Sequence, residues 1–266
     1  MIDNISVMSG VESIGISGGK TPFPRTGEGD IDVFIYGEII PTIEKRQALT
    51  QRLEALFKNF KINIFNGGHW GCGDFLRING IDTWLMYFTV DETIREVESI
   101  LKGAFPDKID NDYYPIGRLA MLKDINVFVD KNGFLGSLKQ KLRVYPESLA
   151  EILVEYHLNR LGDEEDLVRA VTRKDILFYH FALDLALDHF LQALFALNRA
   201  YFPSRKRTME FIGGFKIQPE NCGQRLLDII KLGAHSEEVS QSFVLWCDLV
   251  QELRKIASQV KPRFDE

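Results

Sequence analysis

Two aspartates, Asp30 and Asp32, stand one residue apart at the start of an apolar run, and a glycine-rich stretch precedes them. Side chains alternate along a β-strand, so carboxylates at positions i and i+2 point to the same face. Two carboxylates held side by side repel each other unless a cation or hydrogen-bond donors offset their charge. The pattern therefore predicts a functional site at the start of this strand.

Asp82 is a third acidic residue that can join the pair. It begins the second arm of a predicted hairpin around Asn79-Gly80, because Asn-Gly supplies the positive φ angles of a tight turn. If the strands of Asp32 and Asp82 are neighbours, three carboxylates converge on one face of a sheet. Mg²⁺ commonly takes carboxylates together with substrate phosphates, and a further carboxylate can act as a general base. Asp74, on the first arm, is the rival third acid.

The elements that must position these residues belong to an α+β chain. Strand patterns cover residues 13–19, 30–36, 61–65, the two hairpin arms and 125–130, and helix patterns begin near 42 and 91. After Pro146, apolar residues recur every three to four positions and no strand pattern follows. We therefore predict a mixed-sheet domain over residues 1–145 and an all-helical bundle over residues 146–266.

Composition narrows the classes of function. The 266 residues are 45% apolar, which is enough to bury a full core, and the net charge is −6. A protein that holds a long nucleic-acid strand usually carries a basic stripe, so that class of substrate is disfavoured. Three scattered cysteines predict neither a disulfide framework nor a zinc site. Without a signal-peptide pattern or a long apolar run, we expect a soluble cytoplasmic protein that does not enter membranes.

The motifs resemble those of the polymerase-β-type nucleotidyltransferase superfamily. The shared features are a Gly-Gly turn, about ten residues of loop, Asp-x-Asp opening an apolar strand, and a later acid in Ile81-Asp82-Thr83-Trp84. The order of a sheet domain and a helical domain is similar to that of antibiotic adenylyltransferases. The run LFALNRAYFPSRKR, residues 194–207, resembles a segment of an uncharacterised branch of the superfamily. The resemblance implies a nucleotidyltransferase-like mixed sheet followed by helices.

The resemblance also implies a reaction. Asp30 and Asp32 would ligate Mg²⁺, and Asp82 would be either the general base or a third metal ligand. The chain would transfer a nucleoside monophosphate, AMP from ATP or its equivalent from another nucleoside triphosphate, to a hydroxyl of a small molecule. Two alternatives stay open: a catalytically weak or inactive nucleotide-binding regulator of the same fold, and a modifier of a protein or an RNA end.

The phosphate-binding residues follow from the same resemblance. Gly18 and Gly19 would form the phosphate turn, although Gly19 stands where the superfamily usually has serine. Lys20 follows directly and offers a compensating charge. Arg25 in the glycine-rich loop and Lys206 in the basic run 205–207 are further candidates for phosphate contact. For the run 205–207 the alternative is a solvated helix face.

Overall fold

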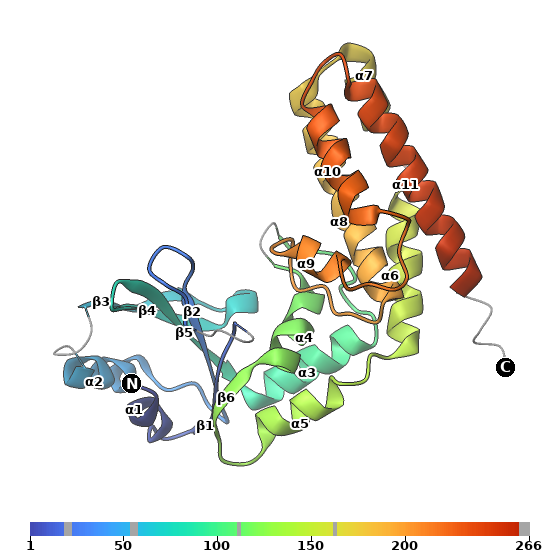
Figure 1. Cartoon of the computed structure of the whole chain (residues 1–266). Coiled ribbons are helices and arrows are strands. Elements are labelled where there is room, and N and C mark those ends of the chain that lie inside the picture. The colour runs from blue at the N-terminus through green and yellow to red at the C-terminus, as the bar shows by residue number, and fades with distance from the viewer. Residues whose placement is uncertain (19–22, 54–57, 111–112, 162–163, 261–266) are drawn as a thin grey trace. The chain divides into compact units, whose positions relative to one another are not determined.

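The computed structural model describes residues 1–18, 23–53, 58–110, 113–161 and 164–260 (Figure 1). The chain divides into two compact units. Unit 1 comprises Met1–Leu101 and Gly117–Val144, and unit 2 comprises Lys102–Ile116 with the described part of Tyr145–Glu266. Unit 1 contains a mixed sheet and unit 2 is mostly helical, so the predicted α+β class is confirmed.

Unit 1 is built on a six-stranded sheet in the order β3-β4-β5-β2-β1-β6. Its strands are β1 (Val11–Ile16), β2 (Ile31–Gly37), β3 (Lys58–Asn66), β4 (Cys72–Ile78), β5 (Ile81–Thr89) and β6 (Asn126–Asp130). β2 pairs with β5 in parallel, whereas the other pairings are antiparallel. The two strands on which the candidate acids were predicted are therefore direct neighbours.

The hairpin between β4 and β5 forms at the predicted turn. Asn79 and Gly80 have φ angles of 50° and 83°, and Ile78 pairs with Ile81 on either side of them. Both central residues need a positive φ in this kind of turn, which an Asn-Gly pair adopts at little cost. The turn fixes the register of β5, and a fixed register decides which of its side chains face the candidate site.

The two faces of the sheet are covered by different helices of unit 1. These helices are α1 (Ile2–Ser6), α2 (Ile43–Leu53), α3 (Val90–Leu101), α4 (Pro115–Asp124) and α5 (Phe134–Lys141), with a 3-10 turn, η1, at Gly68–Trp70. The first two residues of α4 belong to unit 2, and the rest of α4 belongs to unit 1. One face packs its Val33 and Leu85 side chains with Ile5 of α1 and Leu49 of α2. On the other face, Phe34 lies below the Arg118 guanidinium of α4, 5.8 Å from the ring centroid. Asp30 and Asp32 belong to this second face.

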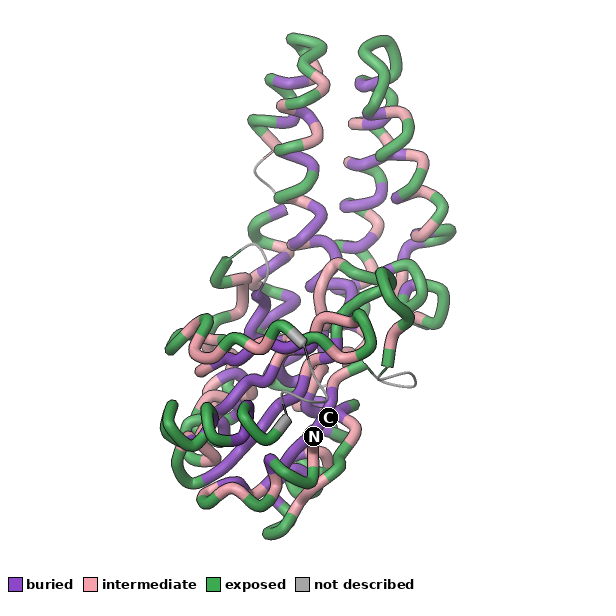
Figure 2. The backbone as a smooth tube through the Cα atoms, turned by 90° about the vertical axis from the view of Figure 1, so that its left-hand side faces the viewer, coloured by how far each residue is buried: buried purple, intermediate pink, exposed green. Residues whose placement is uncertain are grey.

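The helices of unit 2 pack around one central helix, α8 (Ile176–Leu197). The others are α6 (Glu147–Arg160), α7 (Glu165–Arg173), α9 (Thr208–Ile212), α10 (Cys222–Gly233) and α11 (Val239–Val260). From residue 190 to 197 every residue of α8 is buried, while α11 alternates buried and exposed positions as an amphipathic helix does. Figure 2 shows buried and exposed positions along the described backbone. Over the described residues, no helix is long and apolar enough to cross a membrane.

A buried histidine pair lies inside unit 2. The Nδ1 atoms of His157 on α6 and His189 on α8 are 3.0 Å apart, and His157 Nε2 lies 2.8 Å from the carbonyl oxygen of Pro106. His157 is fully buried. Burial, together with the nearby His189, lowers the pKa of His157 to about 4. The pair thus fits two neutral imidazoles: His157 donates from Nε2 to the carbonyl oxygen of Pro106, and its Nδ1 accepts from Nδ1 of His189.

This burial predicts acid sensitivity. The unfolded chain binds a proton at His157 near pH 6.5 and the folded chain only near pH 4, so the stabilising contribution is full above pH 6.5 and is lost as the pH falls to 4. The size of the loss is about 3 kcal/mol. We expect the free energy of unfolding of His157→Gln, measured by urea denaturation, to change less between pH 6.5 and pH 4 than that of the parent protein. The exposed His235→Gln is the matched control, and equal pH profiles for both variants would contradict the assignment.

Candidate functional site

Asp30 and Asp32 lie at the open end of β2. Asp30 is exposed and directly precedes the strand, and Asp32 is half-buried as its second residue. Ile31, between them, points into the core on the opposite face. Two donors already approach the pair: Ser17 Oγ donates to Asp32 Oδ2 at 3.3 Å, and Trp84 Nε1 donates to Asp30 Oδ2 at 3.2 Å. Such donors stabilise the charged form of a carboxylate.

The glycine turn begins beside this pair. Ser17 donates its backbone N–H to the carbonyl oxygen of Asp32 at 3.1 Å, which places the end of β1 against the start of β2. Gly18 follows with a φ of 119°, a conformation that residues with a Cβ rarely adopt, and it is exposed. Gly19 and Lys20 lie outside the described residues, so their predicted phosphate contacts stay predictions.

Arg25 belongs to the loop that returns to β2. Its backbone N–H donates to the Glu28 carboxylate at 3.3 Å, and Glu28 returns a backbone bond to the Arg25 carbonyl at 3.0 Å. This reciprocal turn leaves the Arg25 side chain exposed. Its contact with a phosphate is still a prediction.

The parallel register of β2 and β5 decides which residues face the acid pair. Asp32 lies across from Trp84, and Ile31 lies across from Thr83. Asp82 precedes Thr83, so it shares a face with Trp84 and with the two aspartates. Its carboxylate is bound by Arg77 Nε of β4 at 2.7 Å, in an ion pair that is nearly half exposed on both sides. The three predicted acids therefore share one face, with the indole of Trp84 directly opposite Asp32.

Asp74 is excluded as the third acid by its place in the sheet. It pairs with Leu85, whose side chain points to the core face away from Asp32. The Asp74 side chain is 1% exposed, and it accepts from Arg46 Nη1 at 2.5 Å and from the backbone N–H of Asn63 at 2.8 Å. Burial raises the pKa of its carboxyl despite these donors. The buried Asp74 carboxylate therefore links β4 to α2 and β3.

We expect the buried pair to matter far more for stability than the exposed one. Arg46→Met leaves the Asp74 carboxylate buried without its cation, which costs roughly 3–5 kcal/mol. Arg77→Met breaks the exposed bridge to Asp82 and costs about 1 kcal/mol or less. Urea-denaturation midpoints of the two variants measure the difference. Equal losses would contradict the assignment of Asp74 to the interior.

A row of aromatic rings extends from the acid pair across the same face. The Trp84 ring centroid lies 5.0 Å from that of Phe75 on β4 and 6.2 Å from that of Phe65 on β3. All three side chains are partly exposed. Sequence reasoning did not single them out, because aromatic residues in strands most often indicate a core. The strand alternation from Asp82 to Trp84 is the signal that could have found this row.

The acid pair fits a magnesium ion whose remaining coordination positions are filled by waters and by substrate phosphates. No group of three or more His, Cys, Asp or Glu side chains able to hold a metal occurs within the part of the chain that the structure describes. Mg²⁺ sites for nucleotides are typically formed by one or two carboxylates, several waters and the phosphates themselves. Two carboxylates that stand two positions apart at the start of one strand match that chemistry.

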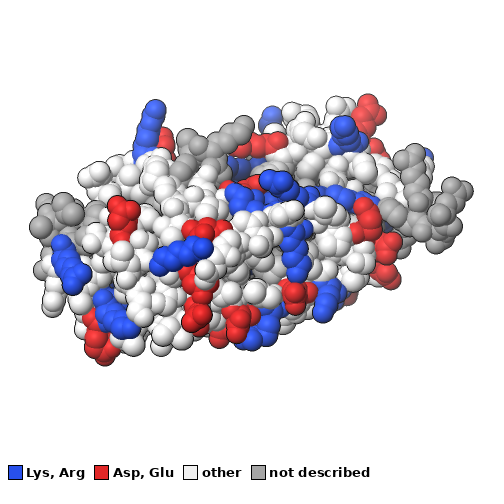
Figure 3. All heavy atoms as spheres, turned by 90° about the horizontal axis from the view of Figure 1, so that it is seen from below, with Lys and Arg blue, Asp and Glu red and all other residues white. Residues whose placement is uncertain are grey.

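The basic run 205–207 lies in unit 2. Arg205 forms an ion pair with Asp184 of α8, and its Nε is 3.2 Å from Asp188 Oδ1. Within the described chain the Lys206 ammonium makes no ion pair, and this side chain is exposed. Figure 3 shows one face of the molecule, on which acidic and basic side chains are interspersed. The phosphate contact of Lys206 stays a prediction.

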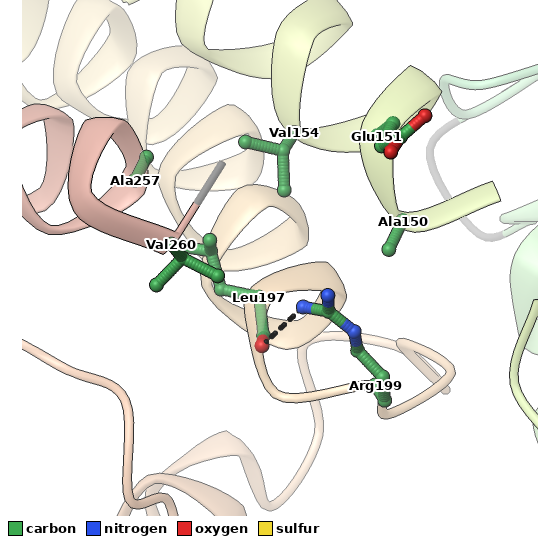
Figure 4. A pocket seen from close by; sticks show the side chains of 7 residues that line it. All are labelled: Ala150, Glu151, Val154, Leu197, Arg199, Ala257 and Val260. Atoms are coloured by element: carbon green, nitrogen blue, oxygen red, sulfur yellow. Dashed lines mark hydrogen bonds between the residues drawn. The ribbon is translucent and has the colours of Figure 1, made fainter. Parts of the chain in front are cut away.

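A small apolar pocket lies in unit 2 between α6, the end of α8 and α11 (Figure 4). It is lined by Ala150, Glu151, Val154, Leu197, Arg199, Ala257 and Val260. Arg199 Nη1 donates to the carbonyl oxygen of Leu197 at 2.8 Å, and its Nη2 binds Glu147 at 2.5 Å. Because the Arg199 guanidinium already binds Leu197 and Glu147, the pocket offers van der Waals contact to a ligand but no group suited to phosphate chemistry.

Comparison with known proteins gives similarities of two kinds, to a protein family and to solved structures. Residues 113–207 match a family described as "Domain of unknown function (DUF4037)", which is less than half of the chain. No curated protein matches the chain. Among solved structures, the chain is similar to the crystal structure of a nucleotidyltransferase-like protein from Exiguobacterium sibiricum 255-15. That similarity has 11% sequence identity and a TM-score of 0.48, and it covers 100% of this chain and 79% of the other.

Proposed function

We propose that this chain is a magnesium-dependent nucleotidyltransferase that transfers a nucleoside monophosphate to a hydroxyl of a small molecule. One observation carries the proposal. Asp30 and Asp32 share a face at the open end of β2, directly beside the glycine turn that leaves β1. A carboxylate pair that can hold a cation, next to a glycine whose backbone can approach a phosphate, is the combination that a metal-bound triphosphate requires.

Each residue of the site has a role in this proposal. Asp30 and Asp32 hold Mg²⁺, which would neutralise charge on the triphosphate and on the departing pyrophosphate. The turn at Gly18 approaches the phosphates through its backbone, because no Cβ intervenes. ATP is the proposed donor, as the resemblance to adenylyltransferases implies.

The reaction is an in-line displacement. The acceptor oxygen forms a bond to the α-phosphorus, the bond from that phosphorus to the bridging oxygen breaks, and pyrophosphate leaves. Asp82 is the candidate that takes the hydroxyl proton. Its ion pair with Arg77 is exposed, and such pairs contribute little, so the carboxylate can exchange Arg77 for an acceptor at small cost. The main work of the site is to position the reactants and to offset charge.

A second candidate function is nucleotide binding without turnover. It is favoured by two features beside the acid pair: an indole, that of Trp84, lies opposite Asp32, and Arg77 binds the carboxylate of Asp82. In that case the acid pair would bind a magnesium nucleotide that regulates the protein, and no base would activate a hydroxyl.

Pyrophosphate release separates the two candidates. The purified chain is incubated with ATP, Mg²⁺ and a pool of small hydroxyl compounds, and released pyrophosphate is measured. Acceptor-dependent release that stops when EDTA is added is expected for the transferase. ATP binding without any release would favour the regulatory candidate, and neither binding nor release would refute both.

A further inference from the structure

An indole from the strand next to β2 contacts the acid pair. Trp84 Nε1 donates to Asp30 Oδ2 at 3.2 Å from the neighbouring parallel strand. An indole N–H is only a donor and carries no charge, so it can hold a carboxylate oxygen without competing as an ion or accepting a proton. The contact leaves the second oxygen of Asp30, Oδ1, to meet a cation.

The indole is itself held in place by rings on two further strands. Phe75 meets it at an interplanar angle of 60° and Phe65 at 39°. The tip of the Phe65 ring lies over Gly73 of β4, where a Cβ would stand only 1.9 Å from Phe65 Cζ. The absence of a side chain at Gly73 therefore makes room for the Phe65 ring, which backs the Trp84 ring, which orients Asp30.

From this chain of contacts we infer that Trp84 is a positioning residue for the cation site. It sets the rotamer of Asp30, so that the carboxylates of Asp30 and Asp32 present a prearranged pair of oxygens to Mg²⁺. The inference deepens the proposed function and rests on it. A prearranged pair binds a cation more tightly than one that must first be ordered, because the ordering cost has already been met during folding.

The test removes the N–H and keeps a ring. In Trp84→Phe the Asp30 carboxylate loses a hydrogen bond to a charged group, and the Mg²⁺ concentration needed for half-maximal ATP binding should rise roughly ten-fold. At saturating Mg²⁺ the affinity for ATP should recover, because the phosphate contacts are untouched. Trp246→Phe is the matched control, since that indole N–H is buried in unit 2 and makes no hydrogen bond within the described structure. Its Mg²⁺ requirement should equal that of the parent.

A second measurement tests the contact without any nucleotide. The chain has three tryptophans, so ¹⁵N-labelled protein gives three indole signals, and the one lost in Trp84→Phe belongs to Trp84. Asp30→Asn should move that signal and leave the Trp246 signal in place. An unmoved Trp84 signal would overturn the contact.

The outcomes separate this inference from the proposed function. If the parent protein does not bind ATP with Mg²⁺, the proposed function fails, and the position of the Trp84 signal in Asp30→Asn still decides whether the contact exists. If the parent binds and Trp84→Phe has the same Mg²⁺ requirement, Trp84 does not position the site and the inference is refuted. A lower melting temperature with an unchanged Mg²⁺ requirement would assign Trp84 to packing alone and would refute it equally.

Discussion

Asp32→Asn is expected to abolish magnesium-dependent ATP binding while the chain stays folded. The substitution removes one of the two charged ligands at the mouth of β2, and an amide is a poor substitute for a carboxylate at a hard cation. The half-buried side chain keeps its shape and its contact with Ser17 Oγ. We expect transfer activity to fall by about 10²–10³-fold, the size of effect seen when a preorganised electrostatic group is lost.

Thermal shift measurements with ATP and Mg²⁺ test this result, because a ligand that binds the native state raises its apparent stability. Glu38→Gln is the matched control: it is an exposed acid that follows the opposite end of the same strand. The control should shift with ATP and Mg²⁺ as the parent does. An equal shift for Asp32→Asn would remove this residue from the metal site.

Asp82→Asn is expected to slow transfer by about 10²–10⁴-fold while ATP and Mg²⁺ still bind. The amide cannot accept the hydroxyl proton, but it leaves the ligand pair on β2 unchanged. Single-turnover rates with saturating ATP, compared with ATP affinity in the same variant, distinguish a base from a ligand. A loss of binding as large as that of Asp32→Asn would make Asp82 a metal ligand.

Unchanged turnover in Asp82→Asn would remove Asp82 from the catalytic residues. Asp74 could not replace it, since that carboxylate is buried on the opposite face of the sheet and is tied to Arg46. The same Glu38→Gln variant controls for the loss of one negative charge, and its rate should match that of the parent.

Much of the fold could be predicted because local patterns were strong. The Asn79-Gly80 turn and the alternating arms around it predicted β4 and β5, and long amphipathic repeats predicted the helices of unit 2. The helices α1, α4 and α5 were missed. They are short, and α4 and α5 each contain a glycine, so packing against the sheet rather than sequence periodicity decides their formation.

The packing of one segment, Lys102–Ile116, also could not be predicted from local sequence patterns. Lys102–Ile116 packs with unit 2 although it lies among segments of unit 1. Its Lys108 and Tyr114 side chains both donate to the buried Asp188 of α8, at 2.6 and 2.7 Å. Such contacts join residues far apart in the sequence, so the local spacing of residues does not predict them.

The candidate site could be predicted only in part. Asp-x-Asp at a strand start placed Asp30 and Asp32 on one face, which the structure shows. The register between β2 and β5 is a tertiary property, so the sequence could not reveal that Trp84 lies opposite Asp32. The hairpin around Asn79-Gly80 pairs Asp82 with Arg77 and Asp74 with Leu85, so the side chains of Asp74 and Asp82 lie on opposite faces of the sheet. Which of these faces also carries Asp32 depends on the pairing of β2 with β5, and the sequence could not reveal that pairing.

Calorimetric titration with a non-hydrolysable ATP analogue, in which a methylene group replaces the α,β-bridging oxygen, tests the central claim most directly. The analogue cannot release pyrophosphate, so binding is measured without turnover. With Mg²⁺ present we expect one binding event, and with EDTA we expect the affinity to fall at least ten-fold, because the acid pair then repels the triphosphate rather than sharing a cation with it. Equal affinity with and without Mg²⁺, or no binding in either condition, would contradict the assignment of Asp30 and Asp32 as a magnesium–nucleotide site.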